Sequence, residues 1–336
     1  MKIIVDAFGG DNAPLEILKG CEQAVRELDV EILLAGRTET ILDVAQKNGV
    51  SLERMEIADA PDVMDMNSAG TDIMKGGKNT SMAVGLQKLA QGAGDAFISA
   101  GNSGALTVGA TFLVKRIKGV RRIAFAPVMP SANGCFMLID SGANVDCKPE
   151  MLNQFGMMGS IYMKKVMGVA DPRVGQLNVG SEEHKGGELQ HAAYALMKAS
   201  PLHFVGNIEA RDVPDGVVDV LVADGFSGNV FLKAYEGVAM MVLHKFKGVL
   251  TKSLKNKLAA AMVIKDINAL KKTMDYNEYG GAPLLGCMKP VFKAHGSAKA
   301  KTFFNALRLT KGYVEGNVAG EIAGSVAAYQ AQGASK

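Results

Sequence analysis

The sequence predicts an α/β protein built on a largely parallel, doubly wound sheet. Short apolar runs of strand length recur along the 336 residues, and most of them alternate with longer segments of helical periodicity. Continuous apolar runs of this kind are typical of parallel strands that helices cover on both faces. With 48% hydrophobic and 21% charged residues, the chain can also bury a sizeable core.

Eight apolar runs are predicted as strands, namely residues 3–6, 30–36, 96–100, 123–128, 136–140, 176–179, 203–208 and 218–223. Residues 123–140 depart from the alternation, because two of these runs are joined only by residues 130–134. This stretch predicts a β-hairpin, which we expect to form an edge or an arm used in dimerisation. No repeat, low-complexity tract or Pro/Ser-rich linker marks a boundary, so we expect a single domain over residues 1–336.

Helical periodicity occurs over residues 14–28, 80–90, 104–118, 149–167, 186–199 and 229–247. Pro14 suits the first turn of the first of these helices. A basic amphipathic helical segment follows at residues 245–272. Its apolar residues change face near Met262, from Leu250, Leu254 and Leu258 to Val263, Ile267 and Leu270. The change predicts a kink or a helical hairpin.

Composition argues against several classes of partner. A net charge of +3 and 6% aromatic residues, with no Trp, give little support to nucleic-acid binding. The four cysteines form no Cys-x-x-Cys pair, which makes structural zinc and a disulfide framework improbable. The N-terminal residues read as a strand and not a signal peptide, and no apolar run has the length of a spanning helix. We therefore expect a cytoplasmic protein whose membrane contact is peripheral.

Common catalytic motifs are missing from the sequence. There is no Gly-x-x-x-x-Gly-Lys-Ser/Thr loop for nucleotide phosphates, and the one Gly-x-Gly lacks the third glycine of the dinucleotide fingerprint. Neither Gly-x-Ser-x-Gly nor His-Glu-x-x-His occurs. A nucleotide hydrolase, a nucleophile-elbow hydrolase and a zincin are thus disfavoured.

Two short segments, residues 99–104 and 224–229, each connect a predicted strand to a predicted helix and consist largely of Gly, Asn and Ser. Glycine allows tight turns, and the free N–H groups at the start of a helix stabilise a phosphate or an oxyanion. Gly9, Gly10 and Asp11 form a third turn of this kind. We expect an anion site at these loops, although plain turns and helix caps have the same composition.

Further polar side chains follow predicted strands. In an open parallel sheet, ligands bind beyond the carboxyl ends of the strands, so we expect these side chains to converge. They are Asp140, Asn144, Asn178, Lys185, Asp224 and Asn229. His184 and His295 are candidates for acid–base chemistry near neutral pH. The alternative is that the histidines are structural, that the two aspartates only cap turns, and that Lys185 is solvated.

The lysines of residues 245–272 suit anionic lipid head groups or an acidic protein. The alternative is a solvated helix packed on the domain or on a dimer mate. A second basic turn, with Lys115, Arg116, Arg121 and Arg122, is equally ambiguous.

Taken together, residues 6–14, 99–105, 140–144, 177–186, 206–209, 224–230 and 280–286 resemble, in the same order, the bacterial phosphate acyltransferases (PlsX family). Phe8 stands where Met is usual in that family, and Ser103 stands where Thr is common. The resemblance implies transfer of a fatty acyl group from acyl carrier protein to inorganic phosphate, which gives acyl phosphate for phospholipid synthesis. It implies a homodimer with a fold like that of isocitrate and isopropylmalate dehydrogenases and phosphotransacetylases, working without nucleotide, metal or other cofactor. It also implies peripheral membrane association, with possible contact to the downstream membrane glycerol-3-phosphate acyltransferase.

Under this resemblance we assign roles to the candidate residues. Lys185 and Asn229 hold phosphate or the oxyanion, and Asp224 orients Lys185 or His295 protonates the leaving thiolate. The surrounding pocket is formed by Asn102, Ser103, Gly104, Gly225, Ser227 and Gly228. Carrier docking is assigned to the basic turn. Membrane contact is assigned to Leu250, Leu254, Lys255, Lys257 and Leu258. The alternatives are a short-chain phosphotransacetylase that uses acyl-coenzyme A and a non-catalytic membrane-surface scaffold.

Overall fold

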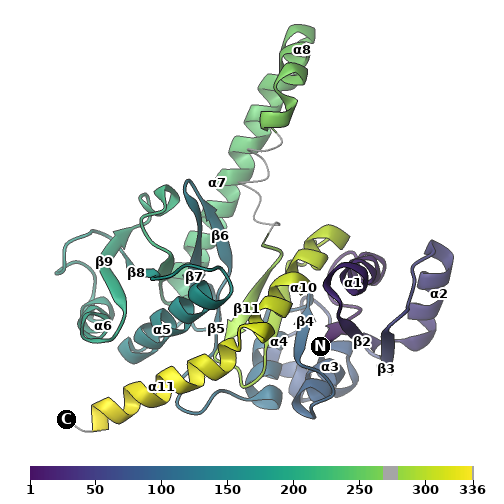
Figure 1. The fold of residues 1–336 in the computed structure, drawn as a ribbon, viewed down its shortest axis with the longest axis horizontal. Coiled ribbons are helices and arrows are strands. Elements are labelled where there is room, and N and C mark those ends of the chain that lie inside the picture. Colours follow the sequence, from purple (N-terminus) through teal and green to yellow (C-terminus); the bar gives the residue numbers. More distant parts are fainter. Residues whose placement is uncertain (268–278, 335–336) are drawn as a thin grey trace.

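The computed structural model describes residues 1–267 and 279–334, and it contains two sheets that helices surround (Figure 1). The first sheet has the strand order β3-β2-β1-β4-β12-β11-β5. Its strands are β1 (Lys2–Asp6), β2 (Glu31–Gly36), β3 (Met55–Asp59), β4 (Ala96–Ser99), β5 (Ala124–Phe125), β11 (Gly281–Leu285) and β12 (Val291–Ala294). The five strands from β3 to β12 are parallel, whereas β11 runs antiparallel to both of its neighbours.

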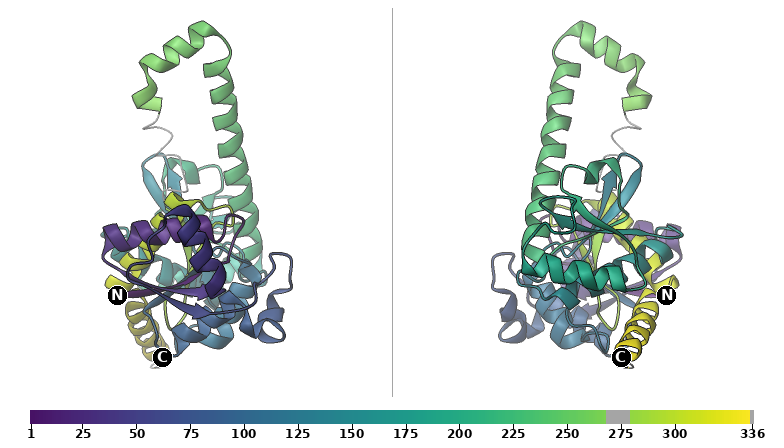
Figure 2. Two further views of the ribbon diagram at one scale, coloured as in Figure 1. Left: turned by 90° about the vertical axis from the view of Figure 1, so that its right-hand side faces the viewer. Right: turned by 90° about the vertical axis from the view of Figure 1, so that its left-hand side faces the viewer.

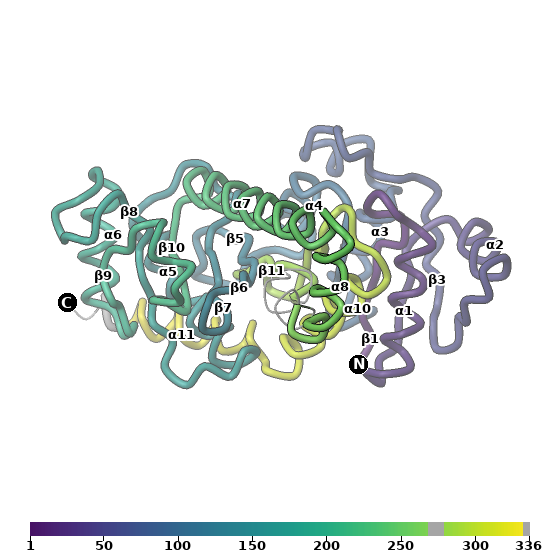
Figure 3. Tube along the Cα trace, turned by 90° about the horizontal axis from the view of Figure 1, so that it is seen from above, coloured from purple at the N-terminus to yellow at the C-terminus, as the bar shows by residue number. Residues whose placement is uncertain are grey.

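The second sheet has the order β6-β7-β10-β8-β9. Its strands are β6 (Val128–Ser131), β7 (Gly134–Ile139), β8 (Arg173–Asn178), β9 (His203–Glu209) and β10 (Val220–Val222). All are parallel except β6, which forms the predicted hairpin with β7. Seen from above, β8 and β9 lie at one end of the molecule and β1 and β3 at the other, with β5, β6 and β11 between them (Figure 3).

The chain crosses between the sheets twice, and the first crossing corrects one predicted strand. Residues 123–128 read as one strand, but Ala124–Phe125 pairs with β11 of the first sheet, whereas Val128 begins β6 of the second. Pro127, which has no N–H to donate to a ladder, lies between them. The chain returns to the first sheet at β11. The predicted parallel α/β fold is confirmed, but its strands are divided between two sheets.

Apart from α2, the helices from α1 to α7 lie where the sequence pattern predicts them. The described helices are α1 (Leu15–Leu28), α2 (Thr38–Asn48), α3 (Ser81–Ala90), α4 (Ser103–Gly109), α5 (Pro149–Lys165), α6 (Glu188–Ala199), α7 (Gly225–Thr251), α8 (Leu254–Met262), α10 (Ala300–Glu315) and α11 (Val318–Ala334). The helix predicted to reach residue 118 ends earlier, in a π-helical turn at Ala110–Val114. Lys115 follows with a φ of 73°, which a continuing helix does not allow. Helical periodicity in the sequence also did not predict α2, α10 or α11.

The apolar strands of the first sheet are buried on both faces. Ile3 and Val5 pack into a core that includes residues of α1 and α10, whereas Ile4 packs with Leu86 of α3 on the other face. The first of these cores continues into α5 and the inner face of the second sheet. The buried rings of Tyr162 from α5 and Tyr313 from α10 lie 6.1 Å apart there. One continuous core therefore connects the two sheets.

Helix α7 extends well past the sheets, and α8 turns back from its end (Figure 2). We call residues 237–267 the arm. The predicted break near Met262 is present, because α8 ends at that residue and Val263 forms a turn before residues 264–267 continue as helix. A second break lies at residues 252–253, where Ser253 Oγ accepts a hydrogen bond from the Asn256 N–H and caps α8. Of the predicted basic segment, Leu270, Lys271 and Lys272 lie outside the described residues. None of the described helices has the length and apolar character needed to cross a membrane.

The start of α7 has no room for a side chain at Gly228. An ideal Cβ there lies 1.9 Å from the Asp140 carbonyl oxygen, which is a backbone atom and cannot swing aside. We expect Gly228→Ala to lower the free energy of unfolding by about 3 kcal/mol or more, as overpacking against backbone does. Chemical denaturation measures this change.

The matched control is Gly324→Ala in α11, where a Cβ meets nothing within 4 Å. There the substitution should raise stability by up to about 1 kcal/mol, because Ala is the better helix former. Equal effects of the two substitutions would contradict the packing described for α7.

Candidate active site

A cleft of about 440 Å³ lies between the two sheets. It is lined by loops that follow β1, β4 and β12 of the first sheet and β7 and β10 of the second. These are the carboxyl ends of parallel strands, where ligands bind in open α/β sheets. The two chain crossings also line it, at residues 125–129 and 279–282. The cleft is therefore a product of the two-sheet arrangement.

The cleft has polar and apolar parts. Its polar lining comprises Asp11, Ser103, Ser141, Asn229, Lys233, Glu236, Tyr279, Lys293, His295 and Ser297. Its apolar lining comprises Met66, Phe125, Pro127, Val128, Met129, Leu232 and Ala282. A ligand with a charged end and an apolar portion fits such a lining.

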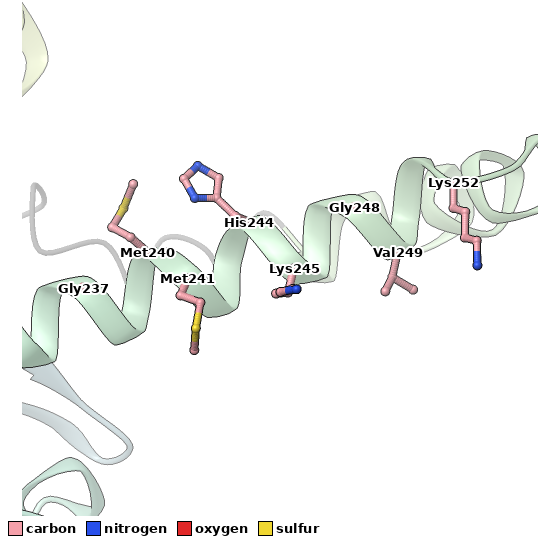
Figure 4. Close-up of a pocket in the computed structure, with 8 residues that line it drawn as sticks. All are labelled: Gly237, Met240, Met241, His244, Lys245, Gly248, Val249 and Lys252. Atoms are coloured by element: carbon pink, nitrogen blue, oxygen red, sulfur yellow. The ribbon is translucent and has the colours of Figure 1, made fainter.

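A hollow of larger volume, about 680 Å³, lies on the arm (Figure 4). Its lining residues extend from Gly237 of α7 to Lys252, the C-cap residue of the same helix. A single helix offers no second wall, so this surface cannot enclose a small substrate. We therefore place the chemistry in the cleft between the sheets.

The two predicted anion loops meet at the cleft from opposite sides. Ser103 reaches it from the first sheet and Asn229 from the second. The Asn102 side chain has a structural role. Its Oδ1 caps α4 by accepting from Ala105 N, and its Nδ2 donates to three carbonyl oxygens of residues 65–68. Gly104 is exposed beside Ser103, and neither amide N–H has an acceptor among the described residues.

The start of α7 differs from a free anion pocket. Asp224 caps the helix, since its carboxylate accepts from both the N–H and the hydroxyl of Ser227. The Gly225 N–H donates to Asn144 O, and the Gly228 N–H donates to Asp224 O. An ideal Cβ on Gly225 lies 2.4 Å from Asn144 O, so close packing explains this glycine as it explains Gly228. The alternative reading of this loop as a helix cap is the one that the structure supports.

Asn229 is the residue of this motif that lines the cleft among those described. Its Nδ2 donates to Ser141 O at 2.9 Å, which fixes the amide beside the loop after β7. The second Nδ2–H and Oδ1 have no partner among the described residues, so they are available to a ligand. The predicted role of Asn229 at an anion stays a prediction, and its position agrees with that role.

Asp140 and Asn144 shape the wall behind Asn229. The buried Asp140 carboxylate accepts five hydrogen bonds, from the backbone N–H groups of Phe125, Gly142, Ala143 and Asn144 and from the Asn144 side chain. Asn144 Nδ2 also donates to Ile123 O. Both side chains are occupied in holding residues 141–144 against the first crossing. They therefore support the cleft from behind.

The turn after β1 packs against the loop after β12. Asp11 N donates to Gly296 O, and Asn12 Nδ2 donates to Ser297 O. Gly10 has a φ of 95° and approaches the same Gly296 oxygen. An ideal Cβ on Gly9 lies 2.7 Å from Asp6 Oδ2, a buried carboxylate that accepts from Ser99 Oγ. The glycines allow the turns to pack closely, and Asp11 is the member that lines the cleft.

Lys185, His184 and Asn178 are absent from the described lining of the cleft. Asn178 ends β8, and His184 and Lys185 lie in the loop between β8 and α6. Asn178 Nδ2 donates to Lys185 O, and His184 O contacts His191 Nε2, so the loop is held by its own contacts. The expected convergence of Lys185 with Asn229 stays a prediction. Asp224 bonds to Ser227 through both carboxylate oxygens, and its predicted role of orienting Lys185 also stays a prediction.

Sequence reasoning missed Lys293, which lines the cleft two residues before His295. Its Nζ donates to Ala100 O at 3.0 Å and to Ala294 O. Burial lowers the pKa of Lys293 to about 8, although Asp6 and Asp11 oppose the change. The sequence pattern did not indicate this residue, because β12 is only four residues long and has no clear periodicity.

His295 lines the cleft as predicted. His295 Nδ1 lies 2.8 Å from Ser297 Oγ and 3.3 Å from Ser297 N, which fixes the ring beside the loop after β12. Burial also lowers the pKa of His295 below its ordinary value. The ring is therefore mainly neutral at pH 7.

The basic turn lies at the opposite edge of the first sheet. Lys115 O accepts from Met288 N, just before β12 begins, whereas the cleft is at the end of β12 where His295 lies. Arg116 donates to Arg121 O. The four basic residues Lys115, Arg116, Arg121 and Arg122 are exposed. Carrier docking at this turn stays a prediction, and the turn is remote from the cleft.

Solved phosphotransacetylases share this fold. The enzyme from Streptococcus pyogenes superposes with a TM-score of 0.64 at 17% identity, and 94% of each chain is covered. The EutD phosphotransacetylase from Staphylococcus aureus gives a TM-score of 0.60 at 15% identity, again over 94% of each chain. The predicted fold class is confirmed.

The family is evident from closer relatives. The sequence model of the family described as "Fatty acid synthesis protein" matches residues 1–321 of this chain. The phosphate acyltransferase of Caldanaerobacter subterraneus is 44% identical, with 95% of each chain covered. That of Acetivibrio thermocellus is 46% identical, covering 94% of this chain and 93% of the relative. The chain belongs to this family of fatty acid synthesis proteins and is an acyltransferase, as its motifs predicted.

The cap at Asp224 can be separated from any role in chemistry. We expect Asp224→Ala to lower the free energy of unfolding by about 1 kcal/mol, as the loss of a helix cap does. Asp224→Ser should restore most of that stability, since a serine hydroxyl also caps. Thermal or urea unfolding of both variants measures the effect. If Asp224→Ser is as stable as the wild type but inactive, the carboxylate has a chemical role that the structure does not indicate.

Proposed function

We propose that this acyltransferase moves a fatty acyl group from the thioester of acyl carrier protein to inorganic phosphate. The products are acyl phosphate, for phosphatidic acid and phospholipid synthesis, and the free carrier thiol. The observation that carries the proposal is the two-sided cleft, whose polar groups suit phosphate and whose apolar lining suits the acyl donor. The names of the relatives agree with a phosphate acceptor.

The reaction requires little more than positioning and charge stabilisation. A thioester is already activated and phosphate is a competent nucleophile, so no enzyme nucleophile is needed. Phosphate would lie between Asn229 on one side and the Ser103 hydroxyl with the adjoining N–H groups on the other. Lys293 supplies positive charge on the same side as Ser103.

The tetrahedral oxyanion needs a hydrogen-bond donor that stays neutral at working pH. His295 meets this requirement, because its lowered pKa leaves the imidazole uncharged, and the tautomer protonated on Nε2, with Nδ1 held beside Ser297, offers an N–H donor. We propose that this N–H faces the thioester carbonyl oxygen. The apolar residues of the first crossing, such as Pro127 and Met129, then lie beside the acyl donor.

The function is tested by comparing two acyl donors, each with inorganic phosphate. We expect long-chain acyl carrier protein to give acyl phosphate, trapped as the hydroxamate, far faster than acetyl-coenzyme A. Asn229→Ala should lower turnover by about 10²–10³-fold, as the loss of a donor to a reacting anion does. Asn48→Ala on exposed α2 is the control.

Three outcomes of this assay would change the proposal. A preference for acetyl-coenzyme A would favour a short-chain phosphotransacetylase. A lack of phosphate-dependent turnover would favour a non-catalytic scaffold. Unchanged turnover in Asn229→Ala would remove that residue from the site. Lys185→Ala in the same assay decides whether the loop between β8 and α6 takes part, because only a reacting or substrate-binding lysine there would lower turnover.

We further propose that the arm contacts the inner face of the cell membrane. Leu254 and Leu258 are 77% and 62% exposed, Met262 is 87% exposed, and Lys255 and Lys257 lie among them. Exposed apolar residues beside lysines suit an anionic bilayer surface. Leu250 is partly buried and contributes less.

Liposome flotation tests this contact. We expect the double substitution Leu254→Glu and Leu258→Glu to lower binding to anionic vesicles at least tenfold, because both apolar burial and the favourable local charge are lost. Leu42→Glu, at an exposed leucine of α2, is the matched control and should float as the wild type does.

The same variants distinguish the membrane from a homodimer. The exposed apolar residues of the arm also suit a second copy of the chain, and we propose that the protein is a homodimer. If the double variant floats normally but sediments as a monomer, the arm is a dimerisation surface. Contact with a downstream membrane glycerol-3-phosphate acyltransferase remains part of the proposal and requires membrane binding first.

A further inference from the structure

Cleavage of the thioester leaves a thiolate, and the sequence did not settle which group protonates it. An alkyl thiol has a pKa of about 8.5, so the departing sulfur needs a proton donor of comparable strength for efficient catalysis. The titratable hydrogen donors among the described cleft residues are Lys233, Tyr279, Lys293 and His295.

Three of these four groups suit this role less well. Lys233 is 60% exposed, and its ammonium is engaged in an ion pair with Glu236 at 2.9 Å. Burial raises the pKa of Tyr279 well above its ordinary value. His295 is largely uncharged at pH 7, because burial lowers its pKa. A neutral imidazole is a hydrogen-bond donor but a weak proton source.

The remaining donor, Lys293, is held at the carboxyl end of β12 by two carbonyl oxygens. Ala100 O belongs to the loop after β4, and Ala294 O follows Lys293 in the chain. An ammonium group has three N–H donors, so one of them has no acceptor among the described residues. Because Lys293 lines the cleft with Ser103 and His295, the third donor is available to a bound substrate.

We propose that Lys293 is the general acid that protonates the leaving thiolate, an inference that rests on the proposed phosphate acyltransfer. A phosphate oxygen bonds to the thioester carbon, and the carbon–sulfur bond breaks with its electron pair going to sulfur. An Nζ proton of Lys293 moves to that sulfur, giving the carrier thiol and a neutral amine. The amine then takes the proton that hydrogen phosphate brought in, which leaves the acyl phosphate dianion and restores the ammonium.

The electrostatic surroundings fit this cycle. Burial lowers the pKa of Lys293 to about 8, close to that of the thiol. The charged groups around it are Asp6 from β1, Asp11 from the following turn, and Lys233 on α7 beside Glu236. His295, two residues further along the chain, is mainly neutral. Lys293 is thus mostly protonated at pH 7 yet able to give up its proton.

The decisive experiment varies the leaving group. We expect Lys293→Met to lower kcat by about 10²–10⁴-fold with acyl carrier protein, the range typical of general acids. With an acyl 4-nitrothiophenol thioester, whose thiolate needs no proton to leave, the same variant should lose less than about tenfold. The KM for phosphate should change little. Lys289→Met, at the other end of β12, is the control and should behave as the wild type does.

A second variant guards against misfolding. Lys293→Arg keeps the charge but holds its proton too tightly to act as an acid, so it should show the same dependence on the leaving group. The wild-type kcat should fall as pH rises through about 8, and this limb should be absent in both variants. Equal losses with both donors, a large rise in the KM for phosphate, or a fully active Lys293→Arg would overturn the proposal. If the wild type forms no acyl phosphate from either donor, the proposed function fails instead.

Discussion

The close packing of the first turn of α7 onto residues 140–144 is the constraint on which the cleft depends. Gly225 and Gly228 bring the helix within contact of backbone oxygens, and the Asp140 carboxylate holds the opposing loop with five hydrogen bonds. This contact aims Asn229 into the cleft. The same helix continues for 27 residues, about 40 Å, into the arm. One rigid element therefore joins the candidate active site to the surface that we propose for the membrane.

The two loops that resemble anion pockets differ in what their polar groups bond to. At the start of α7 the polar groups bond to one another, and the glycines are needed for packing. At α4 the cap is made by Asn102, but the Ser103 and Gly104 N–H groups have no acceptor among the described residues. Glycine has two roles in these loops: it allows the backbone to pack closely, and it leaves N–H groups exposed. The composition of a loop does not show which of these roles its glycines have.

The chemistry of the cleft depends on the segment from Lys293 to Ser297. β12 is inserted between β4 and β11, so its carboxyl end adjoins loops that lie about 200 residues earlier in the chain. Burial lowers the pKa of both side chains: it makes the Lys293 amine a weaker base and leaves the His295 ring a neutral donor. Two side chains separated by one residue thereby acquire different roles.

The sequence by itself determined the parallel α/β class, the helices with strong periodicity, the β6–β7 hairpin and the family, because these follow from local patterns and motif order. It also indicated Ser103, Asn229 and His295 as candidates at strand ends. Only the tertiary structure decided that the strands form two sheets and that Lys293 lines the cleft between them. Strand order depends on pairing between distant residues, such as Phe125 with Leu284, which leaves no periodic trace. The acidity of a side chain likewise depends on burial by residues from other parts of the chain, so it was not readable from its neighbours in sequence.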